Sequence, residues 1–276
     1  MKDSVQQTLE FNDEEEITLQ DRREYLLRKL LSPTGKNKNN PYKRYRGTLL
    51  RYAGGKSLAV GLVTERIPND AKRLISPFLG GGSLETAIAN ELDLKVIGSD
   101  IFDILINFWD FLLNHNNELA DRLEHFEPTK ENYYEQKKIM KKHWDGEELL
   151  QPLELAAQYY FSSQCSYGPH FLGWPSSVYL QEKRYKTHLQ KMRNFSCKNL
   201  KVRCESFERF IPRVKHAMLK KRAEREMVLN ANFPEYRGLI RLSGVLPGSR
   251  FNSLPDLRKT IGSHEKIIMK RINNLL

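Results

Sequence analysis

The sequence predicts an α/β fold built on a parallel, Rossmann-like sheet, and three adjacent features support this. A strand-like run, Arg73–Ser76, leads into a glycine turn, and a helical pattern follows over about residues 84–92. A second strand-like run covers residues 95–99 and ends at Asp100. Strand, glycine turn, helix and strand in this order are typical of parallel sheets with right-handed crossovers.

A charged leader and a linker precede this core, and a long helix follows it. Residues 1–31 form a charged, helix-prone leader, and residues 32–46, rich in Pro, Gly and Asn, are typical of a linker. Beyond Asp100 a long amphipathic helix is predicted from apolar residues at helical spacing, which are Ile101, Ile104, Leu105, Phe108, Leu112 and Leu113.

The middle of the chain differs in character from the strand-rich core. Helical patterns cover residues 117–126, 132–143 and 152–163, and a loop rich in Gly, Pro and aromatic residues extends from 165 to 179. A strand signal returns at Leu200–Cys204. We therefore expect the middle region to be an insertion between two parts of one sheet.

Positive charge is unevenly distributed within a formal net charge of +11. Residues 32–56 contain seven Lys or Arg and no acidic residue, and residues 213–276 contain 14 Lys or Arg against 5 Asp or Glu. Such an excess favours a polyanionic partner, although basic proteins without a nucleic-acid role share it. A cluster of lysines is either a solvated helix face or part of a DNA-binding surface: Lys137, Lys138, Lys141 and Lys142.

Several protein classes are disfavoured by composition. No run of 18 or more apolar residues occurs, so no membrane span is expected, and the acidic, polar first 16 residues do not resemble a secretory signal. The three cysteines, Cys165, Cys197 and Cys204, form no Cys-x-x-Cys pair. Neither a metal site nor a disulfide framework is expected, and a reducing interior is favoured.

The glycine turn Phe78-Leu79-Gly80-Gly81-Gly82-Ser83 is the strongest local motif. Glycines allow close approach of a ligand, and the helix that follows presents free amide donors. Asp100 closes the next strand, where a carboxylate is the expected partner of ribose hydroxyls. These residues predict an adenosine-containing cofactor and leave a nicotinamide dehydrogenase open, as well as a tight turn without ligand. Gly54-Gly55-Lys56-Ser57 is no phosphate loop, because Leu50 stands where that motif needs glycine.

Three motifs in order resemble the Dam-like adenine-specific DNA methyltransferases. Arg51-Tyr52-Ala53-Gly54-Gly55-Lys56 is similar to the family's opening motif, and Ser76-Pro77-Phe78-Leu79-Gly80-Gly81-Gly82-Ser83 to its cofactor motif, with Ser76 where Glu is common. Ser99-Asp100-Ile101 through Asn107 resembles a third motif, with Phe102 where Asn is usual, and Ser206-Phe207 resembles a short motif ahead of the catalytic strand. The resemblance extends over about residues 48–212.

The resemblance implies S-adenosylmethionine as cofactor and methyl transfer to the 6-amino group of an adenine flipped out of double-stranded DNA. Lys56 would pair with the cofactor's carboxylate, Asp100 would hold the ribose, and Ser206 and Phe207 would border its adenine. The complete expected pocket consists of Tyr52, Lys56, Phe78, Gly80, Gly81, Gly82, Ser83, Asp100, Ile101, Ser206 and Phe207.

The resemblance also implies a domain plan. Residues 1–46 would be a charged leader and basic linker, and residues 47–116 with 196–276 the methyltransferase domain. Residues 117–195 would be a helical target-recognition insertion. A monomer is expected, in a bacterial, phage or viral cytoplasm, or in the nucleus if the host is a eukaryote.

The family's catalytic Asp-Pro-Pro-Tyr is not found in this sequence. The prolines beyond Phe207 are Pro212, Pro234, Pro247 and Pro255, none doubled and none followed directly by an aromatic residue. The nearest approach, Asn232-Phe233-Pro234-Glu235-Tyr236, lacks an apolar strand before it. Catalytic residues therefore stay unassigned. The chain is either a diverged enzyme or an inactive relative that binds DNA or cofactor. In the second case it is a decayed, truncated or frame-altered copy that departs from the family after about residue 212. A further interpretation is that the basic tail is a solvated face that helps to hold DNA.

Overall fold

A parallel four-stranded sheet in the order β3-β2-β1-β4 organises the protein. The strands are β1 (Arg73–Ser76), β2 (Lys95–Asp100), β3 (Leu200–Cys204) and β4 (Glu226–Val228). The computed structural model describes residues 17–32, 40–168, 171–220 and 226–228, all within a unit that spans residues 1–230.

The strand order contains a change of direction beside β1. The chain passes from β1 to β2 and on to β3, and then crosses back so that β4 pairs with the other edge of β1, with Leu74 opposite Met227. In open parallel sheets, ligands bind outside the carboxyl ends of the strands at such a switch point. The fold therefore places a binding position at the loop after β1, which is the glycine turn.

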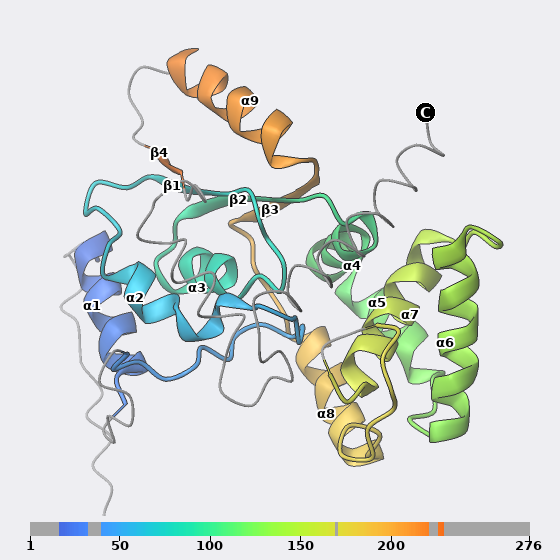
Figure 1. The fold of residues 1–276 in the computed structure, drawn as a ribbon. Coiled ribbons are helices and arrows are strands. Elements are labelled where there is room, and N and C mark those ends of the chain that lie inside the picture. The colour runs from blue at the N-terminus through green and yellow to red at the C-terminus, as the bar shows by residue number, and fades with distance from the viewer. Residues whose placement is uncertain (1–16, 33–39, 169–170, 221–225, 229–276) are drawn as a thin grey trace, which may run out of the picture. The chain divides into compact units, whose positions relative to one another are not determined.

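Helices cover both faces of this sheet, as its apolar strands require. Leu74 and Ile75 of β1 are completely buried. Figure 1 shows α1 (Leu19–Leu30), α2 (Val60–Thr64) and α3 (Ser83–Glu91) on one side of the strands and α9 (Phe207–Lys220) on the other. A short 3₁₀ turn, η1 (Lys56–Leu58), precedes α2.

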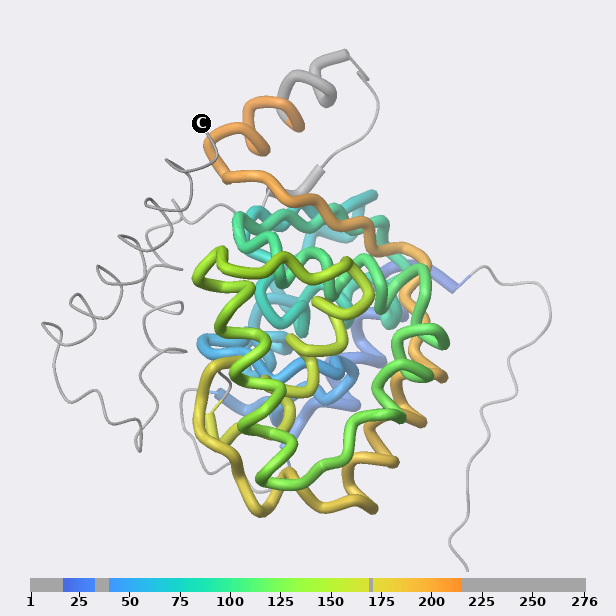
Figure 2. The backbone as a smooth tube through the Cα atoms, turned by 90° about the vertical axis from the view of Figure 1, so that its right-hand side faces the viewer, coloured from blue at the N-terminus to red at the C-terminus, as the bar shows by residue number. Residues whose placement is uncertain are grey.

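The helices between β2 and β3 gather at one side of the sheet (Figures 1 and 2). They are α4 (Asp103–Asn114), α5 (Asn116–Glu124), α6 (Lys130–Asp145), α7 (Pro152–Cys165) and α8 (Glu182–Arg193). The residues of α7 from Ala156 to Cys165 are all buried, because α4, α5 and α6 pack around this helix. The ring of Phe108 on α4 stacks on that of Tyr160 on α7, with centroids 5.4 Å apart.

Most of the expected elements are confirmed. β1, β2, β3 and α3 lie where the patterns predict, and α5, α6 and α7 match the three helical patterns of the middle region to within two residues at each end. α1 lies inside the expected leader, where Thr18 and Asp21 form a capping box at its start. No described helix is long and apolar enough to cross a membrane.

Three expectations need correction. The helix after β2 begins at Asp103, because the Asp100 carboxylate accepts the Phe102 amide and ends the strand there, so Ile101 is excluded and is 48% exposed. Three helices, α2, α8 and α9, were missed. The tail was expected to offer no strand ahead of residue 232, but β4 lies there and pairs with β1. Residues 232–236 themselves are outside the described ranges.

Candidate functional site

The glycine turn between β1 and α3 has a backbone that side chains would not tolerate. Gly80 and Gly82 have φ values of +53° and +62°. A Cβ on Gly82 would lie 2.3 Å from the Trp109 ring, and one on Gly81 would lie 2.6 Å from the Cβ of Tyr52. Thr48 Oγ1 donates to the Gly81 carbonyl at 2.7 Å, and Trp109 Nε1 to the Gly80 carbonyl at 3.0 Å. The turn is therefore fixed from both sides before any ligand arrives.

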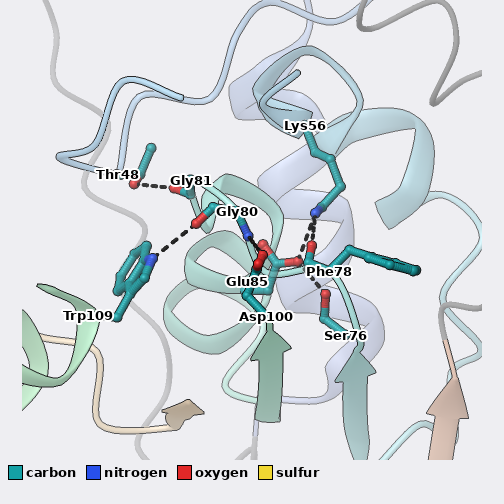
Figure 3. A network of polar contacts seen from close by, with 9 residues as sticks. All are labelled: Thr48, Lys56, Ser76, Phe78, Gly80, Gly81, Glu85, Asp100 and Trp109. Carbon is teal, nitrogen blue, oxygen red and sulfur yellow. Dashed lines mark hydrogen bonds and ion pairs between the residues drawn. The ribbon is translucent and has the colours of Figure 1, made fainter. Parts of the chain in front are cut away.

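Asp100 binds the same turn from the end of β2 (Figure 3). Its Oδ2 accepts the Gly80 amide at 2.9 Å, and its Oδ1 accepts the Phe102 amide at 3.1 Å. A carboxylate has about four acceptor positions, so both oxygens can accept further hydrogen bonds. The side chain is half-buried. Asp100 is thus oriented by backbone amides and can still receive a pair of hydroxyl groups.

The side chain of Tyr52, from the segment before the sheet, packs on the glycine turn. Its ring would contact a Cβ placed on Gly80 at 3.1 Å. Burial raises the pKa of the Tyr52 hydroxyl, and the nearby negative charge of Asp100 raises it further. The phenol is therefore neutral at physiological pH and can donate a hydrogen bond.

Lys56 reaches a completely buried carboxylate that sequence reasoning did not single out (Figure 3). Its Nζ donates to the Phe78 carbonyl at 2.5 Å and lies 3.3 Å from Glu85 Oε1. Ser76 Oγ donates to the same oxygen at 2.5 Å. Glu85 stands in the first turn of α3, where the helix dipole favours a negative charge. Its Oε2 is buried and has no hydrogen-bond partner among the described residues.

An apolar rim lies at the carboxyl ends of β1, β2 and β3. Phe78, Ile101 and Phe207 are 44%, 48% and 43% exposed, and the rings of Phe78 and Phe207 are 5.4 Å apart. Ser206 and Phe207 are brought to this rim because Ser99 Oγ donates to the Glu205 carbonyl at 2.5 Å. Large exposed apolar side chains at a strand edge are typical of a ligand site.

The structure thus brings the expected residues together from four separate segments. Tyr52 and Asp100 contact the turn at Gly80 and Gly81, and Lys56 reaches the carbonyl of Phe78 at its start. Gly82 and Ser83 continue this turn into α3, Ser83 as a buried first helical residue, while Phe78, Ile101, Ser206 and Phe207 lie at its rim. The described residues contain no cluster of three or more His, Cys, Asp or Glu that could hold a metal ion.

A comparison with known families agrees with this geometry. The family described as D12 class N6 adenine-specific DNA methyltransferase matches residues 52–218, which is more than half of the chain. The protein belongs to this family. No curated protein matches it. The matched segment begins at Tyr52 and ends ten residues before Val228, the last residue of β4.

The departure of this chain from the family pattern at Phe102 has a structural counterpart. Phe102 packs against Tyr159 of α7 at 6.0 Å and against Phe171 at 5.6 Å, and Trp144 of α6 lies 6.1 Å away. The loop that contains Phe171 is thereby held next to the end of β2. An aromatic residue at position 102 therefore connects the helical region to the candidate site.

The loop over residues 165–179, expected from its composition, is fixed at its base. The Tyr167 amide donates to the Trp174 carbonyl at 2.7 Å, and the Ser176 amide to the Cys165 carbonyl at 2.9 Å. Arg51 Nη1 donates to the Ser166 carbonyl at 2.9 Å. The side chains of Tyr167 and Trp174 are 80% and 71% exposed. The loop thus presents two aromatic rings to solvent from a rigid base.

The lysine cluster on α6 does not behave as one surface. Lys141 pairs with Asp145, and Lys142 pairs with Glu148 at 3.2 Å. Lys137 donates to the Gly173 carbonyl at 2.9 Å and lies 5.0 Å from the centre of the Trp174 ring. Two of the four charges are therefore neutralised locally, and Lys137 supports the aromatic loop.

Proposed function

We propose that this chain binds S-adenosylmethionine at the carboxyl ends of β1, β2 and β3 and transfers its methyl group to the 6-amino group of adenine in DNA. The observation that carries the proposal is the convergence of Tyr52, the glycine turn and Asp100 at the switch point of the sheet. Membership of an adenine-specific DNA methyltransferase family supports adenine in DNA as the substrate.

The donor set fits this cofactor. Asp100 has acceptor positions left for two ribose hydroxyls, and Phe78, Ile101 and Phe207 offer apolar surface for an adenine ring. Lys56 supplies a cation for the cofactor's carboxylate, and the ion pair with Glu85 keeps the Lys56 ammonium in place. When bound, S-adenosylmethionine supplies an activated methyl group on a sulfonium sulfur. Gly81 and Gly82 let Tyr52 and Trp109 pack closely against the turn, which fixes it for such a ligand.

The chain's own residues prepare the site for a neutral nucleophile. Tyr52 is a neutral hydrogen-bond donor, and Phe78, Ile101 and Phe207 give one side of the site an apolar surface. The 6-amino group of adenine is inaccessible inside a base stack, so the target must leave the duplex. We propose that the helical region, residues 117–195, and its exposed Tyr167 and Trp174 select the target, while residues 47–116 and 196–276 form the methyltransferase domain.

A second candidate function is binding of DNA and cofactor without turnover. The sequence favours it through one observation, the lack of a doubled proline followed by an aromatic residue beyond Phe207. Both functions use the same proposed binding site, and they differ in whether the methyl group is transferred.

A methylation assay separates the two candidates. The chain would be incubated with S-adenosylmethionine carrying a labelled methyl group and with duplexes of varied sequence. Label in the N6 position of adenine supports the enzyme. Cofactor binding without label in any duplex selects the inactive relative. Label in cytosine or in protein contradicts the proposal.

A further inference from the structure

One guanidinium from α8 and one from the N-terminal segment lie on the ring of a single tyrosine. Arg184, His188 and Lys191 are spaced four and three residues apart, so they share a face of the helix. The guanidinium of Arg184 lies 4.4 Å from the centre of the Tyr179 ring, and that of Arg51 lies 3.7 Å from the same centre. Tyr179 thus holds two guanidinium groups close together.

The positive charges of Arg51, Arg184 and Lys191 have no counter-charge in the described part of the protein. Arg51 donates to carbonyl oxygens of Gln164 and Ser166, which carry no net charge. Neither Arg51, Arg184 nor Lys191 forms an ion pair with any described carboxylate. Burial lowers the pKa of His188 to about 4, and the charges of Lys191, Arg184 and Arg51 contribute to the same shift.

The opposite side of α8 is neutralised and provides the contrast. Lys186 pairs with Glu182 at 2.6 Å, and Arg193 pairs with Asp121 at 2.5 Å and Glu124 at 2.7 Å. The lack of counter-charges is therefore a property of the Tyr179 side and not of the whole helix. Clustered cations without counter-charges attract an external anion.

We propose that Arg51, Tyr179, Arg184 and Lys191 form a binding site for a DNA backbone phosphate. Planar guanidinium groups held on an aromatic ring keep their donors directed and bind phosphate oxygens well. Arg51 is followed directly by Tyr52, whose side chain lies against Gly80 and Gly81. A phosphate held here would fix the duplex beside the pocket that receives the flipped adenine. The site rests on the proposed function, because it assigns the DNA contact of that same pocket.

The test compares two double variants that remove the same charge from the same helix. R184Q/K191Q removes cations of the proposed site, and K186Q/R193Q removes cations that are already paired. Arg184, Lys186 and Lys191 are exposed, and Arg193 is half-buried. Binding of a fluorescently labelled DNA duplex would be followed by anisotropy over a range of salt concentrations, and S-adenosylmethionine binding by calorimetry.

We expect R184Q/K191Q to weaken DNA binding at low salt by about tenfold or more and to reduce the slope of log K against log salt by about two units. K186Q/R193Q should keep the wild-type slope, and both should bind cofactor as the wild type does. Equal affinity and slope for the two double variants would overturn the site and leave the proposed function intact. A wild-type chain that binds cofactor and no DNA would overturn both. R184K, which keeps the charge, should retain the slope.

Discussion

At the scale of single residues, the buried carboxylate of Glu85 is the most consequential finding. A charge removed from water is tolerated only with close partners, and here Ser76 and Lys56 provide them from two other segments. In the family motif that the sequence resembles, Glu is common at position 76. Here Ser76 donates to the carboxylate of Glu85 on α3, so a negative charge lies near Lys56.

The first prediction follows from this ion pair. Lys56→Met should lower the free energy of unfolding by about 3 kcal/mol, because Glu85 would stay buried without its cation. The double variant Lys56→Met/Glu85→Leu should recover most of that loss, since no buried charge remains. Urea denaturation of the three proteins measures both effects. A Lys56→Met protein as stable as the wild type would show that the pair is unimportant. Because Lys56 is also proposed to contact the cofactor, neither variant should regain cofactor affinity.

The second prediction concerns Gly82, where backbone conformation and space both demand glycine. Gly82→Ala should cost about 3 kcal/mol of unfolding free energy, because a Cβ suffers at positive φ and also meets the Trp109 ring at 2.3 Å. Gly146→Ala is the matched control. Gly146 has φ of +78° with nothing within 4 Å of an added Cβ, so only about 1 kcal/mol is expected. Equal costs for the two variants would mean that Trp109 does not restrict the turn.

At the scale of elements, strand periodicity and glycine placement predicted the sheet but not every helix. α8 has buried Tyr185, Leu189 and Met192 at helical spacing, but seven charged or amide side chains, one His and one Thr surround them. α9 contains Pro212, which normally argues against a helix interior. β4 has three residues, too few for a period-two pattern to be recognised.

In the site, too, residues that belong to short sequence motifs were predicted, and residues whose environment depends on distant segments were not. Tyr52, the glycine turn and Asp100 were predicted because each belongs to a short motif. Glu85 was not, since a carboxylate in the first turn of a helix is usually solvent-exposed, and its burial depends on Lys56 and Ser76 from elsewhere in the chain. The Tyr179 cluster was missed for the same reason, as Arg51 and Arg184 are far apart in sequence.

The third prediction concerns the rim formed where β1 and β3 end. Phe207→Ala should weaken S-adenosylmethionine binding by roughly tenfold, because burying an aromatic ring against a ligand contributes about 1–2 kcal/mol. Its effect on unfolding should be small, since the ring is 43% exposed. Trp174→Ala removes a ring that is also exposed but lies on the 165–179 loop, and it should leave cofactor affinity unchanged. Calorimetric titration checks both, and equal losses would contradict the assigned rim.

The fourth prediction concerns pH and α8. Burial holds the pKa of His188 at about 4, below its ordinary value of 6.5, so the unfolded chain binds a proton more readily than the folded one. Stability from this residue is therefore present above pH 6.5 and is lost as pH falls from about 6.5 to 4. His188→Gln should flatten the unfolding free energy over that window. Urea denaturation at a series of pH values measures it, and an unchanged slope would contradict the buried, neutral histidine.

At the scale of the whole molecule, one short segment joins the proposed cofactor site to the proposed phosphate site. Arg51 contributes to the Tyr179 cluster, and the next residue, Tyr52, covers the glycine turn. The aromatic contacts of Phe102 and Phe171 couple the helical region to the end of β2. The proposed phosphate site is thus joined to the glycine turn through the adjacent residues Arg51 and Tyr52.

The central claim is that Asp100 and the glycine turn hold S-adenosylmethionine. Its most direct test is calorimetric titration of the chain with this cofactor and, separately, with NAD⁺, using Asp100→Ala and the nearby control Asp103→Ala. We predict one-site binding of S-adenosylmethionine by the wild type and by Asp103→Ala, a loss of at least about tenfold in Asp100→Ala, and no binding of NAD⁺. Wild-type affinity in Asp100→Ala, or binding of NAD⁺ in place of S-adenosylmethionine, would contradict the account.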